Sequence, residues 1–239
     1  MQYRLAASLS CANPICLKED FEQLERSDID VYHIDLCDGV FAPTFLLSTA
    51  AIRALRALSK RRFDVHLYCH QPSLYLEDLR QSGADVVIVH VETRDENYKE
   101  TILKIRAAGM SAGLAILPTS CVPNGLEDTL PLVSVVVANC VGPAFAGQAF
   151  NPNGLRNMRT LSNLVKKLGF EVEIAADGSV CSDRLPMFLE AGCNHFVCGT
   201  SSIFRPGDMA AKVHKFRVEL VEQVRRINPL AFTGEEERQ

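Results

Sequence analysis

The sequence has no long hydrophobic segment, no excess of positive charge and no low-complexity tract over its 239 residues. A membrane-spanning helix needs about 18 or more consecutive apolar residues, and no segment approaches that length, so we expect no membrane partner. The formal net charge is −4 and the pI is about 5.9. Because there is no basic stripe, nucleic acid is not an expected partner either.

Paired cysteines are also missing: the nine cysteines are an odd number, and none lies in a CxxC motif. Several lie in apolar, strand-like segments such as HFVCGT, residues 195–200. This pattern favours buried free thiols in a reducing compartment over a disulfide framework, so we expect a cytoplasmic protein. The first residues, MQYRLAASLSCANP, carry polar residues within a short apolar stretch, which favours a first strand over a signal peptide.

Apolar, strand-like segments alternate with amphipathic, helix-like segments along the chain. The expected strands cover residues 5–10, 31–37, 63–69, 84–91, 111–117, 133–141, 171–176 and 194–199. The expected helices cover residues 48–59, 72–82, 97–108, 153–167, 182–191 and 206–227. Eight strands at a spacing of roughly 30 residues predict an α/β fold, the TIM (β/α)8 barrel. We expect one barrel domain over residues 1–228 and a polar tail over residues 229–239.

A doubly wound open sheet is the alternative to the barrel, since it also alternates strands and helices. That fold binds dinucleotides through a GxGxxG motif after its first strand. No such motif follows the first expected strand here, so the barrel is the preferred prediction.

Polar residues lie where several expected strands end. His33 and Asp35 are two residues apart in VYHIDLC and so project from the same face of a strand. His66 lies near the end of FDVHLY, and Asp177 follows the strand EIAA. Because a barrel gathers the carboxyl ends of its strands at one rim, two imidazoles and two carboxylates can meet there and hold a divalent ion.

Each of these residues also has an ordinary structural interpretation. A lone histidine in a strand is more often a hydrogen-bonded core residue than a ligand, and an aspartate before glycine is more often a turn former. The metal-site hypothesis therefore rests on their occurrence together at matching strand ends. A bound ion would offset the cost of removing two carboxylates from water.

Glycine-containing segments follow the last two expected strands. The loops after strands seven and eight commonly form the phosphate site of a TIM barrel, because glycine allows close backbone approach and helix N-termini supply N–H donors. The expected phosphate site consists of Gly178, Ser179, Gly199 and Thr200. Turn and capping chemistry is the alternative explanation. The small-residue segment VGPAFAGQAF, residues 141–150, suits a mobile flap or a plain loop.

These segments together resemble the ribulose-phosphate 3-epimerase family of ketose-phosphate 3-epimerases. The resemblance covers nearly the whole chain, and the family pattern H-x-D-x-x-D-G-x-F-x-P is matched throughout residues 33–43. It also rests on AASLSCAN (6–13), DVHLY (64–68), PAFAGQAF (143–150), ADGSV (176–180) and GTSSIF (199–204). The forms FAGQ, DGS and GTS are more similar to the D-allulose-6-phosphate branch than to the pentulose branch.

The resemblance implies metal-dependent 3-epimerisation of a ketose phosphate, of the D-ribulose 5-phosphate or D-allulose 6-phosphate type. His33, Asp35, His66 and Asp177 would hold one divalent ion, Zn²⁺ ahead of Mn²⁺, Fe²⁺ or Co²⁺, on the C2 carbonyl and C3 hydroxyl oxygens. Asp35 would remove the C3 proton from one face, giving a cis-enediolate, and Asp177 would deliver a proton to the other face.

The resemblance also implies how the rest of the substrate is bound. Ser8 and His66 would contact it, and the glycine-containing loops would hold its phosphate. A flap would close over the ligand, formed by Ala144, Phe145, Ala146 and Gly147. Family members form dimers or hexamers, so we expect a homo-oligomer.

The chain departs from the family at the wall of the expected site. Cys37, Tyr68 and Asn139 stand where family epimerases usually carry methionines, and Leu117 stands where an asparagine is usual. The first flap glycine is Ala144, whose Cβ restricts positive φ. Since the proposed metal and proton-transfer residues are kept, this pattern predicts 3-epimerisation with an altered substrate preference.

Two alternative functions use the same site. An aldolase would cleave the sugar through the same enediolate, often with a lysine at a strand end, but strands two, three and seven contain none. A non-catalytic sugar-phosphate-binding barrel would not need both aspartates. His70, His90, His195 and His214 are expected to be structural or surface residues. Glu92 either supports the site or is a buried, hydrogen-bonded carboxylate.

Overall fold

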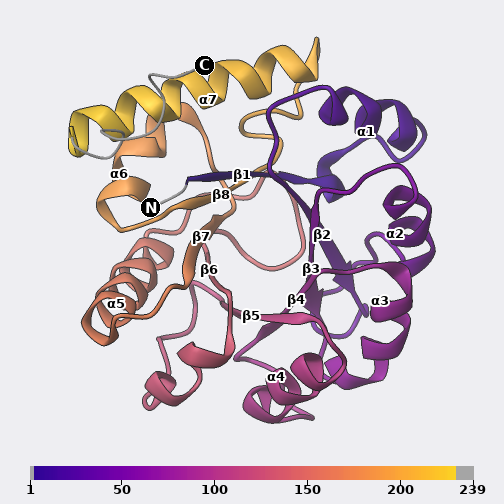
Figure 1. The fold of residues 1–239 in the computed structure, drawn as a ribbon, viewed down its shortest axis with the longest axis vertical. Helices are drawn as coiled ribbons and strands as arrows, with labels where there is room; N and C mark the ends of the chain where they lie inside the picture. Colours follow the sequence, from indigo (N-terminus) through magenta and orange to yellow (C-terminus); the bar gives the residue numbers. More distant parts are fainter. Residues whose placement is uncertain (1–2, 230–239) are drawn as a thin grey trace.

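The computed structural model describes residues 3–229, so nearly all of the tail expected over residues 229–239 lies outside the described residues. Eight parallel strands close into a barrel in sequence order, which confirms the predicted TIM fold. They are β1 (Arg4–Ser8), β2 (Val31–Cys37), β3 (Arg62–Tyr68), β4 (Val86–His90), β5 (Ser111–Ile116), β6 (Val135–Asn139), β7 (Glu173–Asp177) and β8 (His195–Cys198). In Figure 1 these strands lie at the centre with the helices around them.

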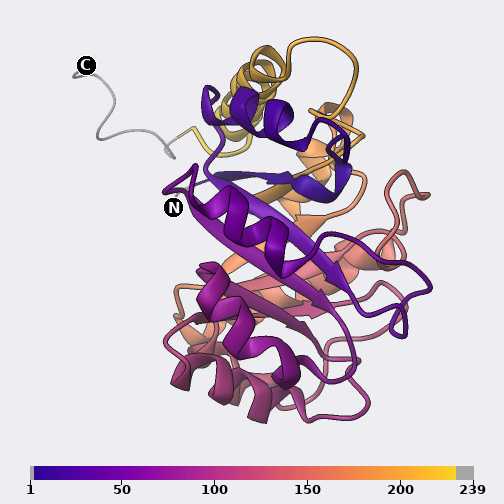
Figure 2. The same cartoon turned by 90° about the vertical axis from the view of Figure 1, so that its right-hand side faces the viewer.

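The outer layer contains seven α-helices within the described part of the chain. They are α1 (Leu17–Glu25), α2 (Thr49–Arg56), α3 (Leu76–Ser82), α4 (Tyr98–Ala107), α5 (Asn153–Leu168), α6 (Leu185–Glu190) and α7 (Met209–Ile227). After β5, two 3-10 turns, Leu126–Asp128 and Leu130–Leu132, take the place of a helix. In Figure 2 the strand arrowheads point to one side, where long loops follow the strands. No helix among residues 3–229 has the length and apolar character needed to span a bilayer.

Besides shifts of one or two residues at the ends of other strands, the structure corrects the predicted elements in two places. The expected helices do not include α1, a short helix whose nine residues LKEDFEQLE bury Phe21 and Leu24. Strand β1 ends at Ser8 rather than at residue 10, because Leu9–Cys11 forms a 3-10 turn. That turn brings Ser10 and Cys11 over the carboxyl end of the barrel, where they line a pocket.

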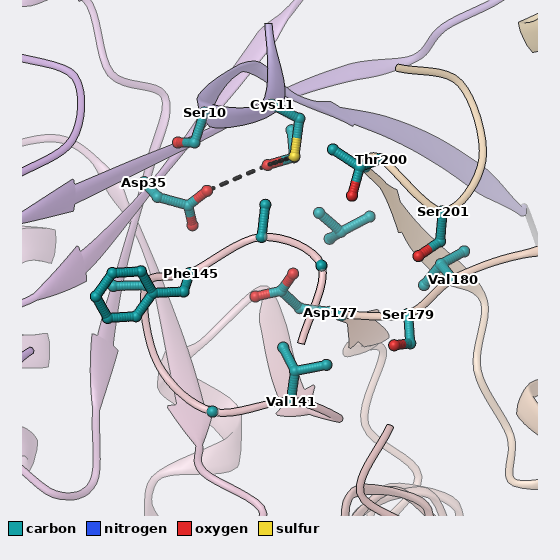
Figure 3. A pocket seen from close by; sticks show the side chains of 18 of the residues that line it. Ser10, Cys11, Asp35, Val141, Phe145, Asp177, Ser179, Val180, Thr200 and Ser201 are labelled. Atoms are coloured by element: carbon teal, nitrogen blue, oxygen red, sulfur yellow. Dashed lines mark hydrogen bonds between the residues drawn. The ribbon is translucent and has the colours of Figure 1, made fainter. Parts of the chain in front are cut away.

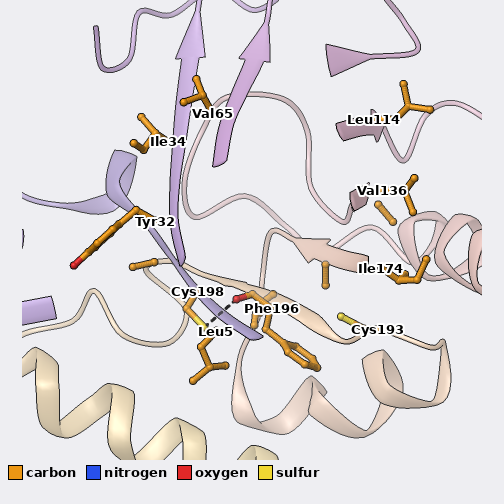
Figure 4. Close-up of a cluster of buried hydrophobic side chains, with 14 of the residues drawn as sticks. Leu5, Tyr32, Ile34, Val65, Leu114, Val136, Ile174, Cys193, Phe196 and Cys198 are labelled. Atoms are coloured by element: carbon orange, nitrogen blue, oxygen red, sulfur yellow. Dashed lines mark hydrogen bonds between the residues drawn. The ribbon is translucent and has the colours of Figure 1, made fainter. Parts of the chain in front are cut away.

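The core has two apolar regions that follow from strand alternation. Side chains such as Leu5, Tyr32 and Ile34 point outward into the large layer between barrel and helices (Figure 4). Their sequence neighbours point inward and fill the barrel, in two clusters that contain Ala6, Val31, Val86, Ile88, Ala115, Val135, Val137, Ala175 and Val197. Since side chains alternate with a period of two, residues 33 and 35 share the inward face with residue 31.

The amino-terminal end of the barrel is closed by charged side chains. Arg62 donates to both carboxylate oxygens of Asp64 at 2.7 Å, and its Nη2 lies 2.7 Å from Glu173 Oε2. Glu173 also contacts Arg4 and, at 2.9 Å, Nδ1 of His195. Asp64 is fully buried, so this network compensates its negative charge inside the barrel.

Replacing Arg62 tests how far the barrel depends on this network. Removal of one member of a buried ion pair costs about 3–5 kcal/mol. Because the Arg62 side chain is 23% exposed, we expect Arg62→Ala to lower the free energy of unfolding by about 3 kcal/mol in urea denaturation. The control Arg53→Ala breaks an exposed pair with Asp78 and should cost about 0–1 kcal/mol. Equal losses in the two variants would contradict the prediction.

Candidate active site

Four side chains from three strands meet inside the carboxyl end of the barrel. They are His33 and Asp35 of β2, His66 of β3 and Asp177 of β7, and one donor atom of each lies within 4.8 Å of those of the others. His33 Nε2 lies 3.2 Å from both Asp35 Oδ1 and His66 Nδ1. His66 Nδ1 lies 3.5 Å from Asp35 Oδ1 and 3.7 Å from Asp177 Oδ2. The structure therefore brings together all four residues of the predicted metal site.

Strand register explains this convergence. In the β2–β3 ladder Asp35 lies beside His66, and in the β1–β2 ladder Ser8 lies beside His33. Asp177 is the last residue of β7 and pairs with Asn139, the last residue of β6. Because all of these residues project inward at the strand ends, the barrel places them at one level.

The donor set fits a divalent cation. Among the ion pairs of residues 3–229, Asp35 and Asp177 contact only histidines, with no lysine or arginine to balance the buried carboxylate of Asp35 and the partly buried one of Asp177. Two imidazole nitrogens and two carboxylate oxygens that converge on one point are typical ligands of Zn²⁺ and of other first-row divalent ions. The site can therefore hold one such ion.

The pKa values of the two carboxyl groups move in opposite directions. Burial raises the pKa of Asp35, but the charge of His33 and the hydrogen bonds of His33 and His66 outweigh it and lower that pKa. Burial raises the pKa of Asp177, and the negative charge of Asp35 raises it further. Two titratable groups whose pKa values are shifted in opposite directions are typical of a base and an acid that share a site.

The two histidines also differ. Burial lowers the pKa of His33, but the charge and hydrogen bond of Asp35 overcome that effect and bring it to about 9. Burial lowers the pKa of His66 to about 3. His33 is therefore the cation of the four-residue cluster near neutral pH, and His66 is neutral.

Two of the three unusual wall residues contact Asp177. Asn139 donates from Nδ2 to Asp177 Oδ2 at 2.9 Å, and the Tyr68 hydroxyl donates to the same oxygen at 3.3 Å. The Asn139 amide is also 3.1 Å from that hydroxyl. Cys37 instead donates to the carbonyl oxygen of Ala42 and does not line the pocket. Tyr68 and Asn139 thus fix one oxygen of the carboxyl group.

A pocket lies over the four-residue cluster, and both carboxylates line it (Figure 3). Ser8 donates to Asp35 Oδ2 at 3.2 Å, which orients that carboxylate. The flap and phosphate residues predicted from the sequence line the same pocket, namely Ala144, Phe145, Ala146, Gly147, Gly178, Ser179, Gly199 and Thr200. Ser10, which sequence reasoning missed, also lines it, and its hydroxyl is a buried polar atom without a hydrogen-bond partner.

Backbone strain is concentrated around this pocket. Ala144 at φ +62° and Ser179 at φ +56° are the non-glycine residues of the described chain with positive φ. Each such residue costs about 1–2 kcal/mol relative to ordinary backbone. Ala144 therefore adopts the conformation that its Cβ disfavours, and strain of this kind clusters at ligand-binding sites.

Sequence reasoning also missed a histidine behind the cluster. His90, the last residue of β4, lies with Nε2 2.9 Å from His66 Nε2 and with Nδ1 2.9 Å from Glu92 Oε2. The backbone N–H of Leu117 donates to Glu92 Oε1 at 2.8 Å. The segment HVE repeats the spacing of HID in β2, and that repetition was the available signal. His195 and His214 instead pair with acidic residues away from the pocket.

Comparison with known proteins places the chain in one family. The sequence model described as "Ribulose-phosphate 3 epimerase family" matches residues 4–204. The chain is 32% identical to ribulose-phosphate 3-epimerase of Synechocystis sp. over 210 residues, which cover 87% of this chain and 90% of that protein. It is 27% identical to the enzyme of the same name from Bacillus subtilis, and the alignment covers 90% of this chain and 98% of that protein. It is 31% identical to the cytoplasmic isoform of ribulose-phosphate 3-epimerase from rice, and the alignment covers 89% of this chain and 93% of that protein.

Solved structures share the fold at lower sequence identity. A structure of KGPDC from Streptococcus mutans aligns with a TM-score of 0.70 at 13% identity, covering 92% of this chain and 98% of that one. The 3-hexulose-6-phosphate synthase from Salmonella typhimurium aligns with a TM-score of 0.60 at 15% identity, covering 93% and 100%. At this identity the likeness shows a common barrel and nothing finer.

The charge on His33 predicts that binding of a metal ion releases a proton. Nε2 must lose its proton before it can bind an ion, and the pKa of His33 is about 9, whereas the neutral His66 has none to lose. At pH 7 about one proton should be released per Zn²⁺, and apparent affinity should rise by about tenfold per pH unit up to the His33 pKa. Calorimetry in two buffers of different ionisation enthalpy measures the proton count.

The matched variant for this experiment is His33→Gln, which removes the titrating ring. Its proton release should be about one proton lower than that of the unaltered protein, while weaker binding persists through the other three side chains. Release of no proton by the unaltered protein at pH 7 would contradict the prediction.

Proposed function

Because the chain belongs to the ribulose-phosphate 3-epimerase family, we propose that it epimerises a ketose phosphate at C3, with Asp35 and Asp177 as the proton carriers. Family membership makes it an isomerase. The observation that carries the proposed mechanism is the pair of carboxyl groups, which enter one pocket from β2 and β7 with their pKa values shifted in opposite directions.

His33, Asp35, His66 and Asp177 would together hold one divalent ion, Zn²⁺ ahead of Mn²⁺, Fe²⁺ or Co²⁺. When bound, such an ion supplies Lewis-acid chemistry: it polarises the ketose carbonyl and makes the C3 proton more acidic. Since imidazole and carboxylate ligands suit all four metals, metal identity has to be measured.

Proton transfer follows from the two carboxyl groups. Asp35 is ionised and accepts the C3 proton from one face of the sugar, leaving an enediolate. Asp177 has the raised pKa, and its Oδ2 is occupied by Asn139 and Tyr68. Oδ1 is therefore the oxygen left to carry a proton to the opposite face of C3. In the reverse direction Asp177 accepts the proton and Asp35 donates it, so the overall reaction consumes none.

The phosphate of the substrate would bind at the carboxyl ends of β7 and β8. Gly178, Ser179, Gly199 and Thr200 line that side of the pocket. Backbone N–H groups in such loops bind phosphate oxygens directly. The flap residues would then cover the ligand, and Ser8 and His66 would contact its sugar.

The substrate is of the D-ribulose 5-phosphate or D-allulose 6-phosphate type. Tyr68, which lines the pocket, and the buried Asn139 that donates to it support a preference that differs from that of other family members, because polar hydrogen-bonding groups replace the usual methionines. We also infer a homo-oligomer, a dimer or a hexamer, located in the cytoplasm. The nine cysteines are all free thiols, as a reducing compartment favours.

Replacing Asp177 separates proton removal from proton delivery. In deuterated water, Asp177→Asn should still exchange the C3 proton of one epimer through Asp35. Formation of the other epimer should fall by about a hundredfold to ten-thousandfold, the usual contribution of one general acid. Proton NMR at C3 measures both rates for D-ribulose 5-phosphate and for D-allulose 6-phosphate, and so also identifies the preferred substrate.

Asp35→Asn is the matched variant, with exchange expected only from the opposite epimer, and metal content is measured in both proteins. Epimer formation by Asp177→Asn at the unaltered rate would refute the assignment. Cleavage into two smaller carbonyl compounds would indicate an aldolase. Binding of phosphosugar by the unaltered protein without any C3 exchange would indicate a non-catalytic barrel.

Replacing Gly178 tests the phosphate site. An added Cβ would lie 2.4 Å from Val141 Cγ2, and φ at this residue is +96°, so the loop must shift. We expect Gly178→Ala to weaken competitive inhibition by inorganic phosphate by about tenfold, the equivalent of one lost hydrogen bond to a charged group. Gly109→Ala is the control, because Gly109 has φ +84° but no atom near its missing Cβ. Equal inhibition constants in the two variants would place the phosphate elsewhere.

A further inference from the structure

We propose that His90 and Glu92 are positioning residues that hold Nδ1 of His66 toward the metal ion through a chain of hydrogen bonds. The inference rests on the proposed function, because it requires the four-residue cluster to bind an ion. It assigns a role to two residues that take part in none of the proton-transfer or substrate contacts described above.

The three side chains form a continuous series. His66 and His90 are fully buried, and their facing Nε2 atoms are 2.9 Å apart. Their ring planes differ by only 14° with centroids 4.8 Å apart, so the two rings lie nearly parallel while their Nε2 atoms are within hydrogen-bond distance. His90 Nδ1 then lies 2.9 Å from Glu92 Oε2.

The carboxylate end of the series and its middle ring are held in place by neighbouring groups. Glu92 is held by the Leu117 backbone, whose N–H donates to Oε1 at 2.8 Å. The ring of Phe41 lies 4.8 Å from that of His90 and covers it. Because hydrogen bonding to His90 favours the ionised form of Glu92 despite its burial, the carboxylate can act only as an acceptor.

This fixed acceptor determines the tautomer of each ring in turn. The carboxylate of Glu92 requires the proton of His90 on Nδ1, so Nε2 of His90 presents a lone pair. That lone pair requires the proton of His66 on Nε2, so Nδ1 of His66 presents its own lone pair to the cluster. An ion needs an unprotonated nitrogen. Glu92 therefore selects, through the ring of His90, the tautomer of His66 that can bind an ion.

Partners of this kind behind a metal-binding histidine orient the ring and raise its basicity, and their loss typically weakens metal affinity by about 10–100-fold. The arrangement here differs from the usual one in having a second histidine between the carboxylate and the ligand. Glu92→Gln should invert the series, because the side-chain amide donates to Nδ1 of His90. His90 would then direct an N–H at Nε2 of His66 and favour the wrong tautomer.

The chain contains a matched control. Glu173 and His195 form a second carboxylate–imidazole contact, also at 2.9 Å from Oε2 to Nδ1, at the opposite end of the barrel. Glu173→Gln removes the same charge from a comparable environment and disturbs the Arg62 network. It should lower stability without changing metal affinity.

The experiment measures Co²⁺ affinity of the three full-length proteins by competition with a chelator, and their visible Co²⁺ spectra. We expect Glu92→Gln to bind about 10–100-fold more weakly than the unaltered protein, with a changed spectrum, and Glu173→Gln to match the unaltered protein. Equal affinities in all three proteins, or equal losses in both variants, would overturn the proposal. Failure of the unaltered protein to bind Co²⁺ would instead overturn the proposed metal site itself.

A second measurement does not depend on any variant that folds poorly. Long-range proton–nitrogen NMR of the unaltered protein, without metal and with ¹⁵N-labelled histidine, reports the tautomer of each ring. The proposal requires the proton of His90 on Nδ1 and that of His66 on Nε2. The opposite tautomer at either ring would overturn it.

Discussion

The carboxyl end of the barrel is organised around the buried carboxylate of Asp35 and the partly buried carboxylate of Asp177, which among residues 3–229 form ion pairs with histidines and with no lysine or arginine. Burial of an unpaired carboxylate is strongly unfavourable, so each nearby group can be understood by how it compensates that charge. His33 supplies a proton, Ser8 donates to Asp35, and Tyr68 and Asn139 donate to Asp177. A divalent ion would replace the proton of His33 and compensate both carboxylates at once.

The two ends of the same barrel differ in the side chains that compensate their carboxylates. At the amino-terminal end, Asp64 and Glu173 are matched by Arg62, whose charge is permanent, in short, two-pronged contacts. At the other end, within residues 3–229, the ion pairs of Asp35 and Asp177 involve histidines, which can lose their charge. Stability can therefore be supplied by one end while the other keeps groups that bind an ion and move protons, as expected for TIM barrels.

Sequence reasoning recovered what depends on local pattern and missed what depends on spatial neighbours. The alternation of segments predicted the barrel, and the H-x-D spacing predicted that His33 and Asp35 share a face. Helix α1 is an exception, because it buries Phe21 and Leu24 just as the predicted helix α2 buries Ile52 and Leu55. His90 was missed because its contact with His66 depends on the β3–β4 ladder, which brings β4 beside β3 and is not visible in the local sequence. Similarly, nothing local places Tyr68 of β3 against Asp177, across the barrel on β7.

The altered wall acts on the acid itself as well as on the space around the sugar. Methionine would contact Asp177 without donating a hydrogen bond, whereas Asn139 and Tyr68 both direct donors at Oδ2. Donation to a carboxylate favours its ionised form, which opposes the upward pKa shift caused by burial and by Asp35. The same contacts restrict rotation of the carboxyl group and leave Oδ1 to face C3. A change at these two positions therefore alters the strength and direction of the proton donor together with the shape of the pocket, so substrate preference and proton-transfer rate should change together.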